Sequence, residues 1–308
     1  MRAITISTFG GPDVVEVVET DVPVPMAGEA RIRVQAAPIQ PADIAVRSGR
    51  FGPMLPEGRR YTLGWDVAGV VDAVGPDVAG VAVGDRVVGL SVWLRTQVGT
   101  HADFVVLPAG DLAPAPLKMP AEAAATLPAN ALTAAQAMAL MNLAPGQTLA
   151  ITGAGGAVGG YAVELARLRG INVIAVASTQ DEQFLTDRGA TFVPRADDPA
   201  RALRTVTPDG VDGLLDTAAL GRLVLPAVAD GGVYIGVIPP LEPPAERGIR
   251  VQTVQLHPDG PLLRELVALA DSGQLTPRVA QTFGFDEASK AHAMAATPGL
   301  RGRVVLLP

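Results

Sequence analysis

Cysteine is absent from this chain of 308 residues. Its absence excludes disulfides, zinc sites built from thiolates and a cysteine nucleophile. Histidine is scarce as well, and the three histidines at positions 101, 257 and 292 lack the close spacing that is typical of metal ligands. We therefore expect no metal site in this protein.

Lysine is also sparse, and acidic residues outnumber basic ones. The formal net charge is −7 and lysine occurs only twice, which excludes the basic surface that nucleic-acid binding requires. The first residues, Met1–Ile6, contain no apolar signal-peptide core, so we expect a cytoplasmic protein. Residues 123–163 carry no charge, but Pro128 and Pro145 interrupt them, and we interpret this stretch as a buried helix and strand, not as a membrane span.

The segment Leu149–Gly160 reads as a buried strand, a glycine-rich turn and the start of a helix. We expect the helix over residues 157–169 and a second strand over residues 172–176, which together form the first half of a dinucleotide-binding unit. Ala154 makes the tight turn in this interpretation, Gly156 admits a pyrophosphate, and Gly159 lets the helix pack closely on the strand. The phosphates then bind the free N–H groups at the helix start, at Ala157 and Val158.

Short strand patterns punctuated by glycine, proline and aspartate fill the first 118 residues and favour a small β-barrel. Strands and helices then alternate, which is typical of a doubly wound parallel sheet. The expected helices of that region lie at 157–169, 181–188, 199–206 and 221–229, and its expected strands at 148–153, 172–176, 190–193, 211–216, 232–237 and 249–254. The tail is expected to contain helices at 262–272 and 286–295 and strands at 278–283 and 304–307, and to return to the first domain.

Other motifs occur in a consistent order along the chain. Gly64-Trp-Asp-Val-Ala-Gly-Val-Val-Asp-Ala-Val-Gly75 is followed by Gly84-Asp-Arg-Val87, and the chain ends with Gly302-Arg-Val-Val-Leu306. With the glycine turn, these motifs resemble the medium-chain dehydrogenase/reductase superfamily, in its zinc-free quinone oxidoreductase-like branch, over nearly the whole chain. The resemblance implies an α/β fold with a GroES-like β-barrel catalytic domain (1–118 and 262–308) and a Rossmann NADP-binding domain (119–261). It further implies an active site in the cleft between them and a homodimer formed through the strand near residues 249–254.

Departures from the zinc enzymes of this superfamily indicate the reaction. Those enzymes carry cysteine where Gln40 stands and His-Glu where Trp65 and Asp66 stand. Without a Lewis acid, an alkoxide is hard to stabilise, whereas reduction of a quinone or an activated C=C needs hydride and a polarised carbonyl. We therefore expect an NADPH-dependent, zinc-independent reductase of quinones or α,β-unsaturated carbonyls, with a small apolar substrate. A ketone or tailoring reductase of a biosynthetic pathway, and a non-catalytic NADPH-binding sensor, remain alternatives.

The residues after the second strand indicate whether the cofactor is NAD or NADP(H). No acid stands at Ser178, where an acidic side chain would bind the ribose of NAD, and the hydroxyls of Ser178 and Thr179 suit a 2′-phosphate. Arg195 or Arg188 is a candidate for the cation that NADP(H) needs, although Asp181 adds negative charge nearby. The other predicted cofactor-binding residues are Asn130 and Thr133 in the charge-free helix, and Gly236, Val237 and Ile238 at a strand end.

The predicted catalytic residues are Gln40, which can bond the substrate carbonyl or the nicotinamide ribose, and Tyr61, a candidate proton donor. Asp43 and Arg47 either take part in the reaction or pair with each other as part of the scaffold. Aromatic residues make up only 4% of the chain, so their grouping is informative. The predicted substrate pocket consists of Gln40, Phe51, Tyr61, Trp65 and Trp93.

Overall fold

The computed structural model describes residues 1–56 and 58–308. The chain divides into two compact units. Unit 1 comprises residues 1–132, 257–273 and 277–308, and unit 2 comprises residues 133–256 and 274–276. The functional domains expected from the sequence, with boundaries at residues 118 and 262, stay a prediction.

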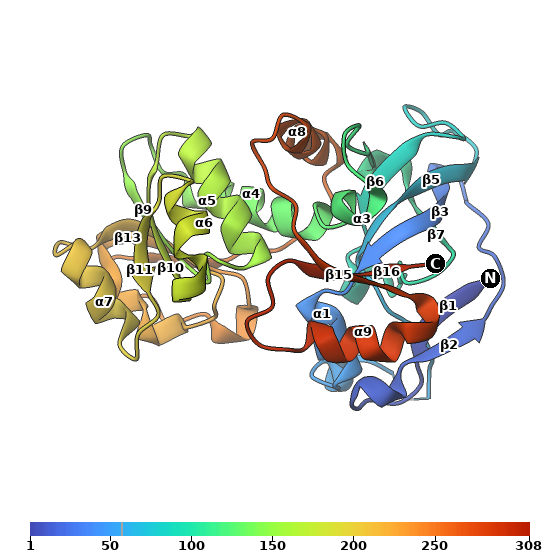
Figure 1. Ribbon diagram of the computed structural model, residues 1–308, viewed down its shortest axis with the longest axis horizontal. Coiled ribbons are helices and arrows are strands. Elements are labelled where there is room, and N and C mark those ends of the chain that lie inside the picture. Colours follow the sequence, from blue (N-terminus) through green and yellow to red (C-terminus); the bar gives the residue numbers. More distant parts are fainter. Residues whose placement is uncertain (57) are drawn as a thin grey trace. The chain divides into compact units, whose positions relative to one another are not determined.

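Unit 2 contains a six-stranded sheet in the order β11-β10-β9-β12-β13-β14. All of its neighbouring strands run parallel. In chain order this arrangement is 3-2-1-4-5-6, the doubly wound topology of dinucleotide-binding folds, as expected from the sequence. The strands are β9 (Thr148–Thr152), β10 (Asn172–Ala177), β11 (Thr191–Pro194), β12 (Val211–Asp216), β13 (Val228–Gly236) and β14 (Arg250–Thr253). The helices beside them are α5 (Ala157–Leu168), α6 (Glu182–Thr186) and α7 (Pro199–Val206) (Figure 1).

The central strands of this sheet are apolar because both of their faces are covered. Ala150, Ile174, Leu214 and Tyr234 are buried in one cluster with residues of α7. Burying a leucine or isoleucine side chain contributes about 1.5–3 kcal/mol, so this layer stabilises the sheet against α7.

Unit 1 is mainly antiparallel. Its described residues form a three-stranded sheet, β2-β1-β4, and a seven-stranded sheet in which β7 pairs with β3 beside the path β15-β16-β3-β5-β6-β8. The tail strand β16, red in Figure 1, lies beside β3, in blue, and pairs with it antiparallel. The strands are β1 (Arg2–Ile6), β2 (Glu16–Glu19), β3 (Glu29–Pro38), β4 (Tyr61–Thr62), β5 (Asp66–Val74), β6 (Arg86–Leu90), β7 (Phe104–Pro108), β8 (Ala113–Pro114), β15 (Val279–Gly284) and β16 (Arg303–Leu307). The helices are α1 (Pro41–Arg47), α2 (Trp93–Thr96), α3 (Ala121–Ala124), α8 (Gly260–Asp271), α9 (Ala288–Ala295) and the first residues of α4 (Pro128–Met141).

The helix expected over residues 221–229 is wrong. Two short 3-10 turns (Gly221–Leu223 and Leu225–Ala227) occupy this segment, and β13 begins at Val228. Gly221 has a positive φ of 55°, and Pro226 has no N–H for a helical hydrogen bond. The expected helix at 181–188 is shorter than predicted, because a 3-10 turn over Thr179–Asp181 precedes α6.

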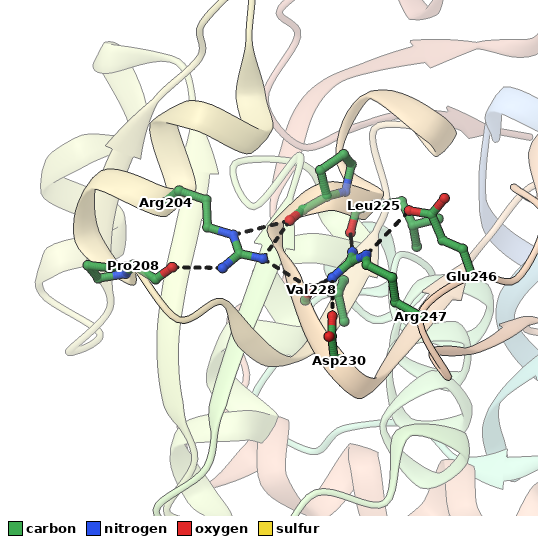
Figure 2. A network of polar contacts seen from close by, with 8 residues as sticks. Arg204, Pro208, Leu225, Val228, Asp230, Glu246 and Arg247 are labelled. Carbon is green, nitrogen blue, oxygen red and sulfur yellow. Dashed lines mark hydrogen bonds and ion pairs between the residues drawn. The ribbon is translucent and has the colours of Figure 1, made fainter.

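Two arginines bond backbone carbonyl groups in and beside this irregular segment. Arg204 donates to the carbonyl oxygens of Pro208 and Pro226, at 2.7 and 2.8 Å. Arg247 donates to the carbonyl oxygens of Leu225 and Val228, at 3.1 and 2.9 Å (Figure 2). The irregular segment therefore depends on side chains from two other parts of unit 2.

Among the residues that the structure describes, no helix has both the length and the apolar character needed to cross a membrane.

Candidate functional site

A glycine-rich turn connects β9 to α5 in unit 2. Gly153 has a positive φ of 63°, and its carbonyl accepts from the N–H of Gly156 at 2.8 Å, so the tight turn spans Gly153 to Gly156 with the buried Ala154 inside it. A Cβ on Gly159 would lie 2.4 Å from the carbonyl oxygen of Gly153, which is backbone and cannot give way. Gly156 is the exposed N-cap residue of α5. Only a residue without a side chain fits at Gly159 if the helix is to start this close to the strand.

This turn has the properties of a phosphate cradle. Ala157 and Val158 form the first turn of α5, whose leading N–H groups have no partner within the helix, and both residues are partly exposed. The first turn holds no acidic residue. Because the helix dipole and the free N–H groups favour negative charge, the geometry suits a pyrophosphate.

Three predicted cofactor-binding residues meet at the carboxyl ends of β10 and β11. Ser178 and Thr179 follow β10 directly, and the N–H of Arg195 donates to the carbonyl of Ala177 at 2.9 Å. Arg195 is exposed. Arg188 is bound elsewhere, since its guanidinium donates to Glu164 at 2.7 Å and to Thr276 at 2.9 Å, and it is corrected from a cofactor candidate to a structural residue.

Asp181 lies over the glycine turn. A Cβ on Gly155 would come within 2.3 Å of its carboxylate oxygen Oδ2, and Asp181 is only 5% exposed. Sequence spacing shows an acid near the ribose position but not that its carboxylate covers this loop. A negative charge therefore stands beside the cradle, opposite in sign to that of Arg195.

At the same edge of the sheet, Gly236 ends β13 beside Asp216, the last residue of β12. Val237 and Ile238 follow it and are partly and well exposed, respectively. The sequence analysis did not single out Asp216. Its buried carboxylate accepts hydrogen bonds from the Tyr234 hydroxyl at 2.7 Å and from the Thr152 hydroxyl, and so fixes the ends of three strands. Burial, together with the bond to Asp216, raises the pKa of Tyr234.

A second cluster of polar groups is buried in unit 1. Gln40 precedes α1, and its Nε2 donates to Asp66 Oδ2 at 2.7 Å. The other carboxylate oxygen of Asp66 accepts from the N–H of Ala129 in the first turn of α4. The Asp43 carboxylate accepts from the N–H groups of Gln40 and Gly64, both at 2.8 Å. Gln40 thus connects the two carboxyl groups.

The two carboxyls are strongly desolvated. Burial raises the pKa of Asp43 and of Asp66 to about 7, against the opposing effects of their hydrogen bonds and of the positive charge of Arg303. Arg303 also donates to the amide oxygen of Asn130, whose nitrogen donates to the carbonyl of Thr126 at 3.0 Å. The amide of Asn130 is thus engaged within unit 1, and its cofactor role stays a prediction. Thr133 is 9% exposed on the same helix, α4.

The residues at the positions of the zinc ligands do not fit a zinc ion. The indole of Trp65 is no ligand, and the Gln40 nitrogen donates a hydrogen bond to Asp66. No group of three or more histidine, aspartate or glutamate side chains that suits a metal occurs within residues 1–56 and 58–308.

The aromatic residues of the predicted pocket do not all face one space. Trp93 is fully buried and donates to the carbonyl of Thr62 at 2.6 Å, so its assignment to the pocket is wrong; it packs in the core, edge-on to Tyr61. The Tyr61 hydroxyl donates to the carbonyl of Pro56 at 2.6 Å, and that bond must break if Tyr61 is to give a proton to a substrate. Trp65 is buried and Phe51 is half-buried.

The alternative that Asp43 and Arg47 pair as scaffold is wrong. Asp43 is bonded to backbone N–H groups, and Arg47 is buried near His292. Within the described part of the chain, Arg47 Nε and Nη1 have no hydrogen-bond partner.

The sequence matches two protein families along most of its length. Residues 26–117 match the alcohol dehydrogenase GroES-like domain, and residues 188–306 match the zinc-binding dehydrogenase family. A quinone oxidoreductase of Sus scrofa is 29% identical, over 100% of this chain and 98% of its own length. A 2-methylene-furan-3-one reductase of Solanum lycopersicum is 27% identical, over 100% of this chain and 79% of its own length.

Solved structures of similar fold also cover the whole chain. The crystal structure of an NAD-dependent alcohol dehydrogenase superposes with a TM-score of 0.86 at 31% identity, covering 100% of both chains. A mycobacterial protein complexed with NADPH has a TM-score of 0.84 at 25% identity, also over 100% of both chains.

Proposed function

This chain belongs to the medium-chain dehydrogenase/reductase superfamily, in its quinone oxidoreductase-like branch, and on that premise we propose that it reduces quinones or α,β-unsaturated carbonyls with NADPH and without zinc. It is an oxidoreductase of a pyridine-nucleotide-dependent family. The observation that carries the proposal is the turn from Gly153 to Gly159, which presents the start of α5 at the carboxyl edge of a parallel sheet.

The residues of unit 2 bind and orient the nucleotide in this proposal. The N–H groups of Ala157 and Val158 bond the pyrophosphate, and Ser178, Thr179 and Arg195 hold the 2′-phosphate. Gly236, Val237 and Ile238 would offer backbone groups to the carboxamide, and the Thr133 side chain would contact the nicotinamide ring. The bound nicotinamide supplies the hydride.

Gln40 polarises the substrate in unit 1. An amide N–H donates to the carbonyl oxygen that gains negative charge as hydride arrives at the electron-poor carbon. Zinc independence is supported by the donor set: Trp65 is no ligand, and Gln40 already bonds Asp66. A simple ketone lacks the conjugation that spreads this charge. A single hydrogen-bond donor then stabilises the localised charge too weakly, so we expect simple ketones to be poor substrates.

The test measures oxidation of NADPH and NADH with 9,10-phenanthrenequinone, an alkenal and a simple ketone, before and after dialysis against a chelator. We expect turnover of the first two substrates with NADPH, at a rate that the chelator does not change. Turnover of the ketone alone would favour the ketone-reductase alternative. Nucleotide binding without turnover of any substrate would favour the sensor.

We also propose a homodimer. Strand β14 is the last strand of the six-stranded sheet, and its outer edge is available to pair with a second copy of the chain. Light scattering of the eluting protein gives its mass directly, and a monomer mass of 31.6 kDa would contradict this proposal.

A further inference from the structure

Asp43 and Asp66 are two fully buried carboxyls, and the positive charge of Arg303 favours ionisation of both. If both carboxyls were ionised, they would leave one excess negative charge in a region closed to water, which costs several kcal/mol. Each carboxyl also disfavours ionisation of the other, since the Asp43 charge raises the pKa of Asp66. This cluster therefore holds at least one proton up to about neutral pH.

The hydrogen-bond partners decide which carboxyl holds the proton. Both partners of Asp43 are backbone N–H groups, of Gln40 and Gly64, and a backbone N–H can only donate. Asp66 has one such partner, Ala129, but its second partner is the side-chain amide of Gln40. An amide has a donating end and an accepting end, so it can turn to accept a proton from Asp66. Asp66 can therefore be protonated without its new O–H pointing at another hydrogen-bond donor.

We propose that Asp66 is a positioning residue whose protonation state sets which end of the Gln40 amide faces the substrate. Ionised Asp66 accepts from Gln40 Nε2, at 2.7 Å, as the structure shows. Protonated Asp66 donates to Gln40 Oε1 instead, and the amide NH₂ group turns away from Asp66. The proton stays between these two side chains and is not passed to the substrate.

This inference rests on the proposed function, in which Gln40 donates to the substrate oxygen. Only the NH₂ end of the amide can donate two hydrogens, and only a donor stabilises an oxygen that gains negative charge. The form with protonated Asp66 directs both hydrogens of that end to the substrate and is the active form, whereas ionised Asp66 takes one of them and holds the amide nitrogen against its own carboxylate. Activity therefore falls as the pH rises through the titration of Asp66.

The groups around Asp66 act on this titration from three elements and from the residue that precedes α1. Asp43 on α1 opposes ionisation, whereas Arg303 on β16, the Ala129 N–H of α4 and Gln40 favour it. Burial outweighs the favourable contacts and raises the pKa of Asp66 to about 7. The transition falls in a pH range where the enzyme can be assayed from both sides.

The substitution Asp66→Asn tests the proposal. The asparagine oxygen can accept from Ala129, and its NH₂ group donates permanently to Gln40 Oε1, as protonated Asp66 does. We expect the wild-type kcat/KM for 9,10-phenanthrenequinone to fall about tenfold per pH unit above the transition. The variant is expected to change less than about twofold between about pH 6 and about pH 9.

Asp72→Asn is the matched control, because Asp72 lies on the same strand and pairs with Arg31 at 2.9 Å. It is expected to keep the wild-type pH profile. If the Asp66→Asn enzyme still loses kcat/KM above neutral pH as the wild type does (the alkaline limb of the profile), the proposal is overturned. If that variant does not fold, Gln40→Met serves in its place: removing the amide is expected to abolish the limb, and a retained limb counts against the proposal.

A measurement without turnover separates this inference from the proposed function. In protein labelled with ¹³C at the aspartate carboxyls, the resonance lost in Asp66→Asn is expected to titrate near neutral pH. The side-chain amide resonances lost in Gln40→Met are expected to shift with the same midpoint. An Asp66 carboxyl that stays ionised from about pH 5 upwards overturns the inference even if quinones are reduced. If no substrate is reduced, the proposed function fails, and this titration still decides the inference.

Discussion

Two side chains of opposite charge lie near the predicted ribose position in unit 2. The exposed Arg195 is held beside the end of β10 by its backbone N–H, and the buried Asp181 covers Gly155. A 2′-phosphate gains a charge-assisted hydrogen bond from Arg195 but meets the field of Asp181. The preference for NADPH therefore depends on the arginine outweighing the aspartate.

The substitution Arg195→Gln tests this balance at the scale of one residue. We expect the Kd for NADPH to rise about tenfold or more, because a hydrogen bond to a charged group contributes ~1.5–3 kcal/mol. The Kd for NADH should stay within about twofold of the wild-type value, since NADH has no 2′-phosphate. Titration of cofactor fluorescence gives both constants.

Arg169→Gln is the control for this experiment, because Arg169 lies at the other end of α5 and is also exposed. It removes the same charge at a distance from the predicted phosphate site. A wild-type protein that binds NADH more tightly than NADPH, or an unchanged Kd in Arg195→Gln, contradicts the assignment.

The segment from residue 221 to residue 231 shows how side chains decide the conformation of an element. Arg247 donates to the carbonyls of Leu225 and Val228 and to the carboxylate of Asp230 (Figure 2). Replacing it by methionine keeps the side-chain stem but removes these donors. We expect Arg247→Met to lower the free energy of unfolding by about 1–2 kcal/mol, in the range for loss of partners from partly buried carbonyls.

Hydrogen exchange locates this effect. Amides of residues 221–231 should exchange faster in Arg247→Met than in the wild type, whereas those of β9 at the centre of the sheet should not change. Arg201→Met, at an exposed position on α7, is the control and should leave the segment protected. Uniform acceleration across unit 2 would show that the arginines do not act locally.

For the molecule as a whole, four buried ionisable groups make the stability depend on pH in opposite directions. Burial lowers the pKa of His101 to about 4 and lowers that of His292 well below its usual value. The unfolded chain thus binds more protons at these histidines, and their contribution to stability falls as the pH drops from about 6.5 towards about 4. Asp43 and Asp66, with pKa values raised to about 7, favour the folded state at low pH and lose that contribution as the pH rises from about 4 to about 7.

These two effects on the free energy of unfolding oppose each other. Replacing one histidine should therefore make its share of the pH dependence measurable. We expect His292→Leu to gain stability relative to the wild type as the pH drops from about 6.5 to about 4.5, by up to ~1.4 kcal/mol per pH unit. Urea unfolding at several pH values measures the difference between the two proteins. A difference that is independent of pH would show that His292 is not held neutral by the fold.

Local patterns predicted most elements of unit 2. Helix α7 and strand β12 lie at their expected residues, because each follows from a clear periodicity and, for α7, from Asp198 and Pro199 at its start. The segment 221–229 failed because its apolar residues also fit a helix, and the arginines that bond its carbonyls come from residues 204 and 247. No local pattern contains that information.

The candidate site divides in the same way. The glycine turn, Ser178 and Gln40 could be found from the sequence, since each lies in a motif with a direct chemical reason. Asp216 and the contact of Asp181 with Gly155 were missed or left unplaced, because they depend on which strand ends become neighbours. Trp93 was misassigned because scarcity of aromatic residues says nothing about which side chains are buried.

The sequence by itself determined the family, the parallel sheet and the glycine turn, because these depend on residue types at fixed local spacing. Only the tertiary structure decided that Gln40 bonds Asp66, that two carboxyls share one cation, and that Arg188 belongs to a structural pair. The bonds of Gln40 with Asp66 and of Arg188 with Glu164 join residues 26 and 24 positions apart, and Arg303 lies more than 200 positions from either carboxyl that its charge affects. Desolvation and partner geometry exist only once the chain has folded, so the protonation chemistry of this protein is a property of its fold.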